Sequence, residues 1–91
     1  MSRISVYSTR VCPYCVMAKR MLDAKGAAYD DLRIDEDAAA RAEMQKRAPA
    51  ARTVPQIFIG ETHVGGFDEL AALERAGKLD SLLAPYIEGQ G

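Results

Sequence analysis

The chain has 91 residues, 48% of them hydrophobic, and a formal net charge of -1. This length supports one modest hydrophobic core, so residues 1–91 are expected to form a single domain. The nearly balanced charge offers no basic surface for nucleic acid, and no apolar stretch is long enough to cross a membrane.

The start of the chain and its cysteine content bear on where the protein works. Residues Met1–Tyr7 contain no apolar signal core. The chain has only two cysteines, and a bridge between such close positions would restrict the unfolded chain very little. We therefore expect a cytoplasmic protein in a reducing environment, and not a secreted protein stabilised by disulfides. We also expect a monomer.

A strand and a helix are expected first. Residues Ile4 to Ser8 alternate and favour β-structure, which predicts a strand. Pro13 suits the first helical position, because its missing N–H would have no partner there. The helix is expected to run to about Lys25 and to end at Gly26. Its apolar face comprises Cys15, Ala18 and Leu22.

A second strand and helix follow. Ala28 to Ile34 is the strand candidate. The acidic run Asp35–Asp37 is expected to cap the next helix and to complement its dipole. That helix should end near Ala48, just before Pro49.

The second half of the chain predicts a hairpin and a helix. Two short β runs from Val54 to Gly66 flank a Gly60-Glu61 turn, and lone His63 is expected to be a strand side chain. A helix from Phe67 to Ala76 and a short amphipathic piece from Leu79 to Tyr86 complete the chain. The order β-α-β-α-β-β-α predicts an α/β fold with a central four-stranded mixed sheet flanked by helices.

The motif that carries chemistry is Cys12-Pro13-Tyr14-Cys15, between the first strand and the first helix. Cys12 would lie where free N–H groups and the helix dipole favour a thiolate, with Arg10 as a nearby cation. Cys15, one turn later, would be more buried and would attack a mixed disulfide formed at Cys12. Tyr14 would set an aromatic ring and a hydroxyl beside the reacting sulfur. The motif predicts thiol–disulfide exchange.

Three other interpretations of the cysteine pair compete with this one. A structural zinc site needs four ligands, and the only other soft ligand is distant His63. Two unreactive core thiols fit poorly at a junction preceded by Ser8, Thr9 and Arg10. A structural staple is disfavoured by the short loop. No metal is expected.

Three motifs in order resemble those of the dithiol glutaredoxins, which have a thioredoxin-like fold. They are the Cys12–Cys15 run, the segment Arg52-Thr53-Val54-Pro55-Gln56-Ile57-Phe58-Ile59, and Gly65-Gly66-Phe67-Asp68. The likeness extends from about Ile4 to Leu83, which is nearly the whole chain.

This resemblance implies a glutathione site. Val54, before a cis Pro55, would pair its backbone with the cysteinyl unit of glutathione. Gly66 would allow close backbone approach, and Asp68 would meet the α-ammonium group while also serving as a helix N-cap. The resemblance implies a binding set of Arg10, Tyr14, Arg52, Thr53, Val54, Pro55, Gly66, Phe67 and Asp68. Arg52, Arg47 and Gln56 are the candidates for the glycyl carboxylate.

The sequence departs from the family pattern at two positions. Thr9 stands where many members carry a lysine, and the cation is Arg10, one place later. Phe67 follows the glycine pair, so the chain has no third cysteine.

The resemblance implies a glutathione-dependent oxidoreductase that reduces protein–glutathione mixed disulfides and protein disulfides. Its partners would be glutathione and the proteins that carry these disulfides. Two alternatives stay open. One is an iron–sulfur module in which Cys12 and glutathione hold a cluster between two protomers. The other is a thioredoxin-like reductase fed by a flavoprotein.

Overall fold

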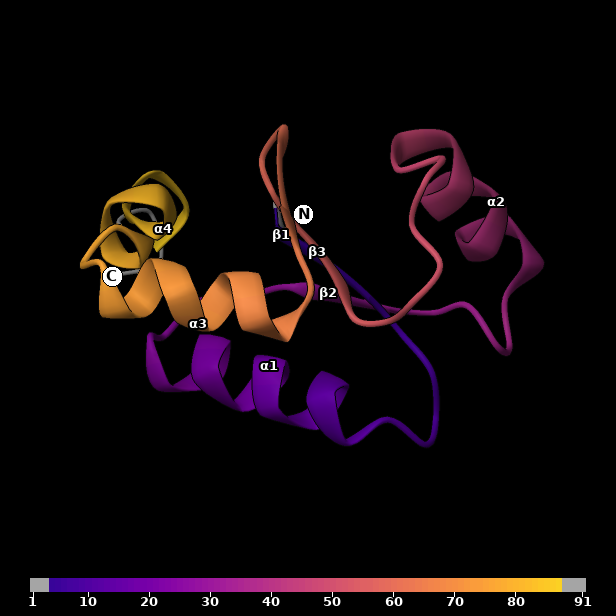
Figure 1. The fold of residues 1–91 in the computed structure, drawn as a ribbon, viewed down its shortest axis with the longest axis horizontal. Coiled ribbons are helices and arrows are strands. Elements are labelled where there is room, and N and C mark those ends of the chain that lie inside the picture. Colours follow the sequence, from indigo (N-terminus) through magenta and orange to yellow (C-terminus); the bar gives the residue numbers. More distant parts are fainter. Residues whose placement is uncertain (1–3, 88–91) are drawn as a thin grey trace.

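A computed structural model describes residues 4–87. Four strands and four helices follow one another in the order in which the sequence predicts them (Figure 1). Their bounds are β1 Ile4–Ser8, α1 Pro13–Ala24, β2 Asp30–Arg33, α2 Ala38–Arg47, β3 Gln56–Ile59, β4 Thr62–Gly65, α3 Phe67–Arg75 and α4 Leu79–Ile87. Within these residues, no helix is long and apolar enough to span a membrane.

The strands form one mixed sheet in the order β2-β1-β3-β4. β1 is parallel to β2, whereas β3 is antiparallel to both β1 and β4. The parallel pair comes from the β1-α1-β2 crossover, and the antiparallel pair β3–β4 is the hairpin. This arrangement confirms the predicted four-stranded mixed sheet and the thioredoxin-like α/β fold.

Helices cover both faces of the sheet. α1 and α3 run side by side on one face, α4 packs against them, and α2 covers the other face (Figure 1). The alternation along β1 divides the core, because Ile4 and Val6 pack with α1 and α3, whereas Tyr7 packs with α2. The larger cluster comprises Ile4, Val6, Ala18, Leu22, Ala27, Ile57, Ile59, Leu70, Leu79 and Leu83.

Three local predictions need correction. The second strand covers only Asp30–Arg33, because these four residues are the ones that pair with Ser5–Ser8 of β1. α2 has Asp37 as its only acidic cap, its carboxylate accepting from two backbone N–H groups at the start of the helix. The N-cap of α3 is Gly66, and Asp68 lies inside the first turn.

Candidate active site

Cys12 is the N-cap of α1. Its backbone is extended, Pro13 takes the first helical position, and the Cys15 N–H donates to Cys12 Sγ at 3.1 Å. This sulfur therefore occupies the place where a serine or aspartate oxygen commonly caps a helix. A hydrogen bond from an amide at the positive end of a helix favours the negatively charged form of the sulfur.

The two cysteines differ in exposure as the sequence predicts. Cys15 is 1% exposed, whereas Cys12 is only half-buried. They form a disulfide with their Cα atoms 5.2 Å apart. An outside thiol can therefore reach Cys12 far more readily than Cys15.

The loop before β3 lies against the cysteine pair. The Val54–Pro55 peptide bond is cis, as the resemblance implies. The carbonyl oxygen of Val54 lies 3.7 Å from Cys12 Sγ. Backbone from a distant part of the chain thus forms one side of the site.

A groove of about 410 Å³ opens between α1, this loop and the start of α3. The rings of Tyr14 and Phe67 stack at its rim, with centroids 6.3 Å apart. This groove brings together seven of the nine residues that were predicted to bind glutathione. The lining residues are Tyr14, Thr53, Val54, Pro55, Gly66, Phe67, Asp68 and Glu69.

Glu69 belongs to the groove although sequence reasoning missed it. Its Oε1 accepts the Gly66 N–H at 2.7 Å, which fixes the start of α3. The signal for it was an acidic residue three positions after the glycine that caps the helix. A Cβ at Gly66 would lie 3.3 Å from the Glu69 carboxylate and 3.6 Å from the Pro55 carbonyl oxygen, so this position suits glycine.

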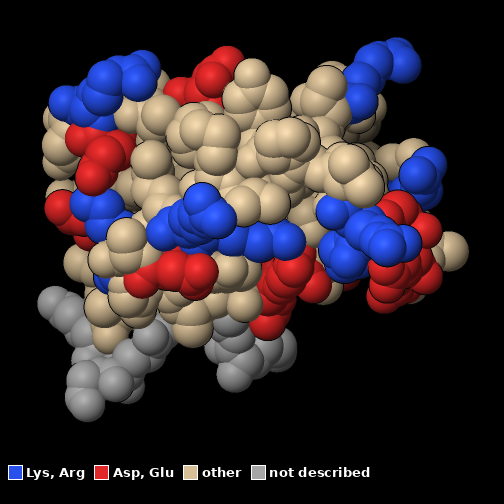
Figure 2. All heavy atoms as spheres, turned by 90° about the horizontal axis from the view of Figure 1, so that it is seen from below, with Lys and Arg blue, Asp and Glu red and all other residues tan. Residues whose placement is uncertain are grey.

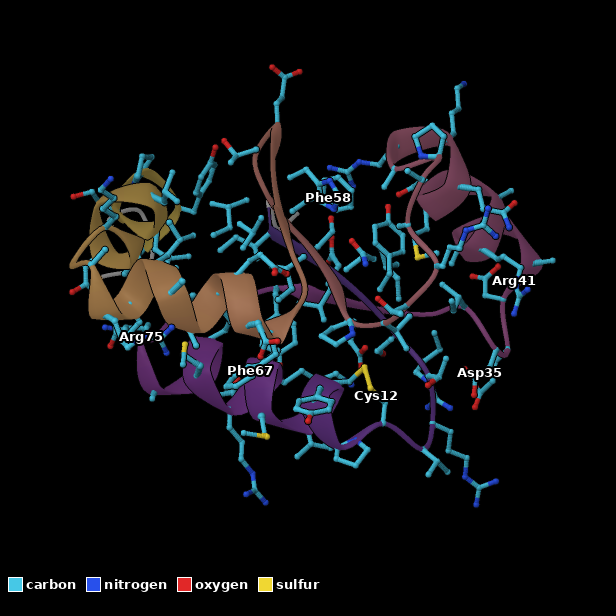
Figure 3. The ribbon with its side chains drawn as sticks, in the orientation of Figure 1. Cys12, Asp35, Arg41, Phe58, Phe67 and Arg75 are labelled. Carbon is cyan, nitrogen blue, oxygen red and sulfur yellow. A yellow bond between two sulfur atoms is a disulfide. The ribbon has the colours of Figure 1, made fainter. Side chains whose placement is uncertain are left out.

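A second groove of about 590 Å³ lies on the α2 side of the same loop. It shares Thr53 and Val54 with the first, and Arg41 and Arg52 supply its positive charge. Figure 3 shows Phe67 on one side of Cys12 and Arg41 on the other. The lining residues are Thr9, Ile34, Arg41, Met44, Gln45, Ala51, Arg52, Thr53 and Val54.

Arg10 lines neither groove. Its side chain is exposed, and its backbone N–H donates to Asp35 Oδ2 at 2.9 Å. Arg33 binds the same carboxylate through two side-chain nitrogens. The Arg33 guanidinium, aided by the Arg10 amide, lowers the pKa of Asp35 to about 2. Asp35 therefore anchors the loop that carries Cys12.

Arg47 and Gln56 are committed to internal contacts. The Arg47 guanidinium lies 3.9 Å from the centroid of the Phe58 ring and donates to the Tyr7 hydroxyl at 3.0 Å. Gln56 is buried and donates to the Thr53 carbonyl oxygen. Arg41, which the sequence did not single out, occupies the groove instead.

The surface around the motif carries several exposed apolar side chains. Val11 is 85% exposed, and Tyr14, Val16 and Met17 are also exposed. Viewed from the α1 side, a broad area without charged residues is bordered by arginines, lysines and acidic residues (Figure 2). A partner larger than a small thiol can therefore contact this face without desolvating many charges.

The described residues offer no donor set for a metal ion. Within residues 4–87 no group of three or more His, Cys, Asp and Glu side chains comes together. His63 in β4, the only histidine, stacks on Phe58 and hydrogen-bonds Gln56, both of which belong to β3. It is a strand side chain, as predicted.

Disulfide exchange requires an accessible sulfur, a second sulfur that can displace the first partner, and a surface that aligns them. Cys12, Cys15 and the Val54 backbone meet these requirements at one end of the two central strands, β1 and β3. The fold and site together define a thioredoxin-like thiol–disulfide oxidoreductase.

Comparison with known proteins specifies the family. The glutaredoxin family model matches residues 4–64, and the chain belongs to the glutaredoxin family. It is 51% identical over 84 residues to a glutaredoxin of Pseudomonas aeruginosa, covering 92% of this chain and 99% of that protein. It is 48% identical over 83 residues to glutaredoxin 3 of Escherichia coli, covering 91% and 99%.

Solved structures agree with this assignment. A buckwheat glutaredoxin–glutathione complex matches with a TM-score of 0.81 at 34% identity, covering 91% of this chain and 77% of that one. A glutaredoxin from Brucella melitensis matches with a TM-score of 0.75 at 49% identity, covering 91% and 89%.

Proposed function

We propose that the protein reduces protein–glutathione mixed disulfides, and also protein disulfides, with glutathione as the reductant. The observation that carries this proposal is the pair of grooves that meet at Thr53 and Val54 beside Cys12. Their ends differ in charge, with Asp68 at the start of a helix in one and Arg41 and Arg52 in the other.

That distribution complements extended glutathione. The γ-glutamyl end carries an ammonium group and a carboxylate, which suit Asp68 and the positive N-terminus of α3. The glycyl carboxylate suits the guanidinium groups of Arg41 and Arg52. The cysteinyl unit would lie between them and pair with the Val54 backbone, which brings its sulfur to Cys12. The buckwheat relative, solved as a glutathione complex, supports this assignment.

The first reaction needs Cys12 alone. Its thiolate attacks the glutathione sulfur of a mixed disulfide, so the substrate protein leaves as a thiolate and takes up a proton. A second glutathione thiolate then attacks the glutathione sulfur now bonded to Cys12. This step releases Cys12 as a thiolate and yields glutathione disulfide.

Protein disulfides require Cys15 as well. Cys12 attacks one sulfur of the substrate, and the other leaves as a thiol. Cys15 then loses its proton, attacks Cys12 Sγ, and displaces the second substrate sulfur. The resulting Cys12–Cys15 disulfide is reduced by two glutathione molecules, and the low exposure of Cys15 makes Cys12 the sulfur that they attack.

The same proposal includes the setting of the reaction. Glutathione must be kept reduced for this cycle to turn over, which fits a cytoplasmic protein. We propose that it acts as a monomer, because each step above uses sulfurs of one chain. The apolar surface around Val11 and Tyr14 would meet the protein substrate.

The test is glutathione-dependent reduction of a small mixed disulfide, coupled to glutathione reductase and NADPH. Cys12→Ser should abolish turnover. Cys15→Ser should keep it within about threefold of wild type but lose reduction of protein disulfides. Equal loss from both substitutions in the first assay would contradict the assignment of roles.

The same purified protein distinguishes this proposal from the iron–sulfur and thioredoxin-like hypotheses. The iron–sulfur hypothesis predicts visible absorbance and dimerisation with glutathione, whereas this proposal predicts a colourless monomer. The thioredoxin-like hypothesis predicts turnover with a flavoprotein reductase and no glutathione.

A further inference from the structure

We propose that Gln56 and His63 are positioning residues, which hold the Thr53–Val54 backbone against Cys12. This role rests on the proposed function, since that backbone is the surface on which glutathione would lie. Neither side chain lines either groove. Both therefore act through the loop and do not touch the substrate.

The segment that needs positioning lies outside the sheet. β3 begins only at Gln56, so the Thr53–Pro55 backbone is not held by the strand ladder. Pro55 has no N–H to donate. The Val54 carbonyl oxygen nonetheless lies 3.7 Å from Cys12 Sγ, a placement that would let the Val54 backbone bind the cysteinyl unit of glutathione next to Cys12.

Gln56 supplies the missing support. Its side chain turns back along the chain, and Nε2 donates to the Thr53 carbonyl oxygen at 2.9 Å. Gln56 is 6% exposed, and the hydrogen bond is partly buried although Thr53 itself lies at the surface. It fixes the peptide group immediately before Val54.

His63 completes the chain of hydrogen bonds. Its Nε2 lies 2.7 Å from Gln56 Oε1. Because the Gln56 amide nitrogen already donates to Thr53, its oxygen must accept, and His63 Nε2 must carry a hydrogen. The relay therefore runs from His63 through Gln56 to Thr53, and it orients the Gln56 amide so that its nitrogen faces the loop.

The His63 ring is itself held in place. It stacks on Phe58 with centroids 4.5 Å apart and planes 13° apart. Phe58 also packs against Tyr7 in a T-shaped arrangement and against the guanidinium of Arg47. Figure 3 shows Phe58 lying well away from Cys12, toward the hairpin. The relay thus connects the packed hairpin to the redox site.

Three substitutions separate the hydrogen-bond role from simple packing. Gln56→Leu has similar volume but neither donor nor acceptor. His63→Phe keeps a ring to stack on Phe58 but cannot donate, whereas His63→Gln can donate but has no ring. Thr62→Ala, at an exposed neighbouring position of β4, is the matched control.

The expected kinetic result is a split between KM and kcat. Gln56→Leu should raise KM for a glutathionylated peptide about tenfold and leave kcat within about threefold. His63→Phe should raise KM in the same direction by less, and His63→Gln should restore it close to wild type. Thr62→Ala should change neither constant.

A measurement on the protein alone keeps this inference apart from the proposed function. The NMR order parameter of the Val54 amide should fall from a rigid value of about 0.85 toward about 0.6 in Gln56→Leu. If wild type shows no turnover with glutathione, the proposed function fails, and the order parameter still decides whether the relay holds Val54.

The proposed positioning role is overturned if Gln56→Leu leaves both KM and the Val54 order parameter unchanged. It is also overturned if His63→Phe behaves as wild type while His63→Gln does not, because the ring alone would then matter. A parallel loss of kcat and melting temperature without a change in KM would assign Gln56 to stability only.

Discussion

At the scale of single residues, the site depends on a few polar contacts that reach across the fold. Asp35 binds Arg33 beside it and the backbone of Arg10, which precedes the nucleophile. Glu69 fixes the turn at Gly66, which leaves its neighbour Asp68 exposed at the mouth of the groove. Side chains that do no chemistry thus set where the reacting groups lie.

Asp68 is expected to recognise the ammonium group of glutathione. Asp68→Asn should raise KM for a glutathionylated peptide about threefold to tenfold with little change in kcat, because an ion pair made equally in ground and transition states is lost. Steady-state kinetics in the coupled assay would measure this. The same kinetics for Glu74→Gln, on α3 but outside the groove, provide the control; equal effects of both would remove Asp68 from the binding set.

Asp35 should give stability a dependence on acid. Its pKa is lowered to about 2, so its contribution is fully present above the ordinary carboxyl pKa of 3.8 and is lost as pH falls toward 2. The melting temperature of Asp35→Asn should therefore be lower than that of wild type near neutral pH. This difference in melting temperature should disappear between pH 4 and about 2. Asp30→Asn, an exposed carboxylate in β2, should show a smaller gap throughout.

At the scale of elements, the turns and helix ends determine how the strands and helices around the site are aligned. Gly60 joins β3 to β4 with φ of 61°, and Gly26 ends the α1 region with φ of 71°. Both conformations favour glycine, but their surroundings differ. A Cβ at Gly60 would overlap the Tyr86 hydroxyl, whereas one at Gly26 would meet nothing within 4 Å.

This difference makes a matched pair of substitutions informative. Gly26→Ala should cost about 1 kcal/mol, the penalty for a left-handed alanine. Gly60→Ala should cost more, because α4 must also yield at Tyr86. Chemical denaturation would compare them. Equal losses would mean that the Tyr86 side chain moves aside freely.

Elements were largely predictable because their signals are local. The Pro13 start, the Gly26 end and the hairpin turn each depend on residues close together in sequence. Asp35 was misjudged as a cap, because it binds Arg33 and the backbone of Arg10, and Arg10 lies 25 positions earlier and is brought close only by tertiary folding.

Local sequence patterns could not predict which arginine of α2 would line the second groove. Arg41 and Arg47 flank the buried stripe of α2, formed by Ala40 and Met44, on opposite sides. Helical periodicity separates the two positions, but which side turns toward the groove depends on how α2 packs on the sheet. The roles of Gln56 and His63 were hidden for the same reason, since a side-chain relay across a hairpin leaves no pattern in the sequence.

At the scale of the whole molecule, the site lies at the end of the central strands β1 and β3, between the helices that cover the two faces of the sheet. α1 and α3 contribute from one face and α2 from the other, with the Val54 loop between them. Far from the site, Lys25 pairs with Glu74 and Asp80 and ties the end of α1 to α3 and α4. The hydrogen bonds with Asp80 and then Glu74 raise the pKa of Lys25.

The sheet order predicts how the molecule opens. β1 and β3 are paired on both sides, whereas β2 and β4 are edges. Native-state hydrogen exchange should be slowest at amides of Val6 and Ile57, which are 0% exposed, and faster in β2 and β4. Edge strands that exchange as slowly as β1 would show that the sheet opens only as a unit.

The Cys12 sulfur that caps α1 also links two equilibria that are usually measured separately, which are the folding of the chain and the reduction of its disulfide. A stronger hydrogen bond from the Cys15 amide to the Cys12 thiolate stabilises the folded reduced chain more than the folded oxidised chain. A closed thermodynamic cycle then requires the disulfide to become easier to reduce by the same free energy. Substitutions in the first turn of α1 that never touch a substrate should therefore change the reduction potential and the difference in stability between the two redox forms in strict proportion.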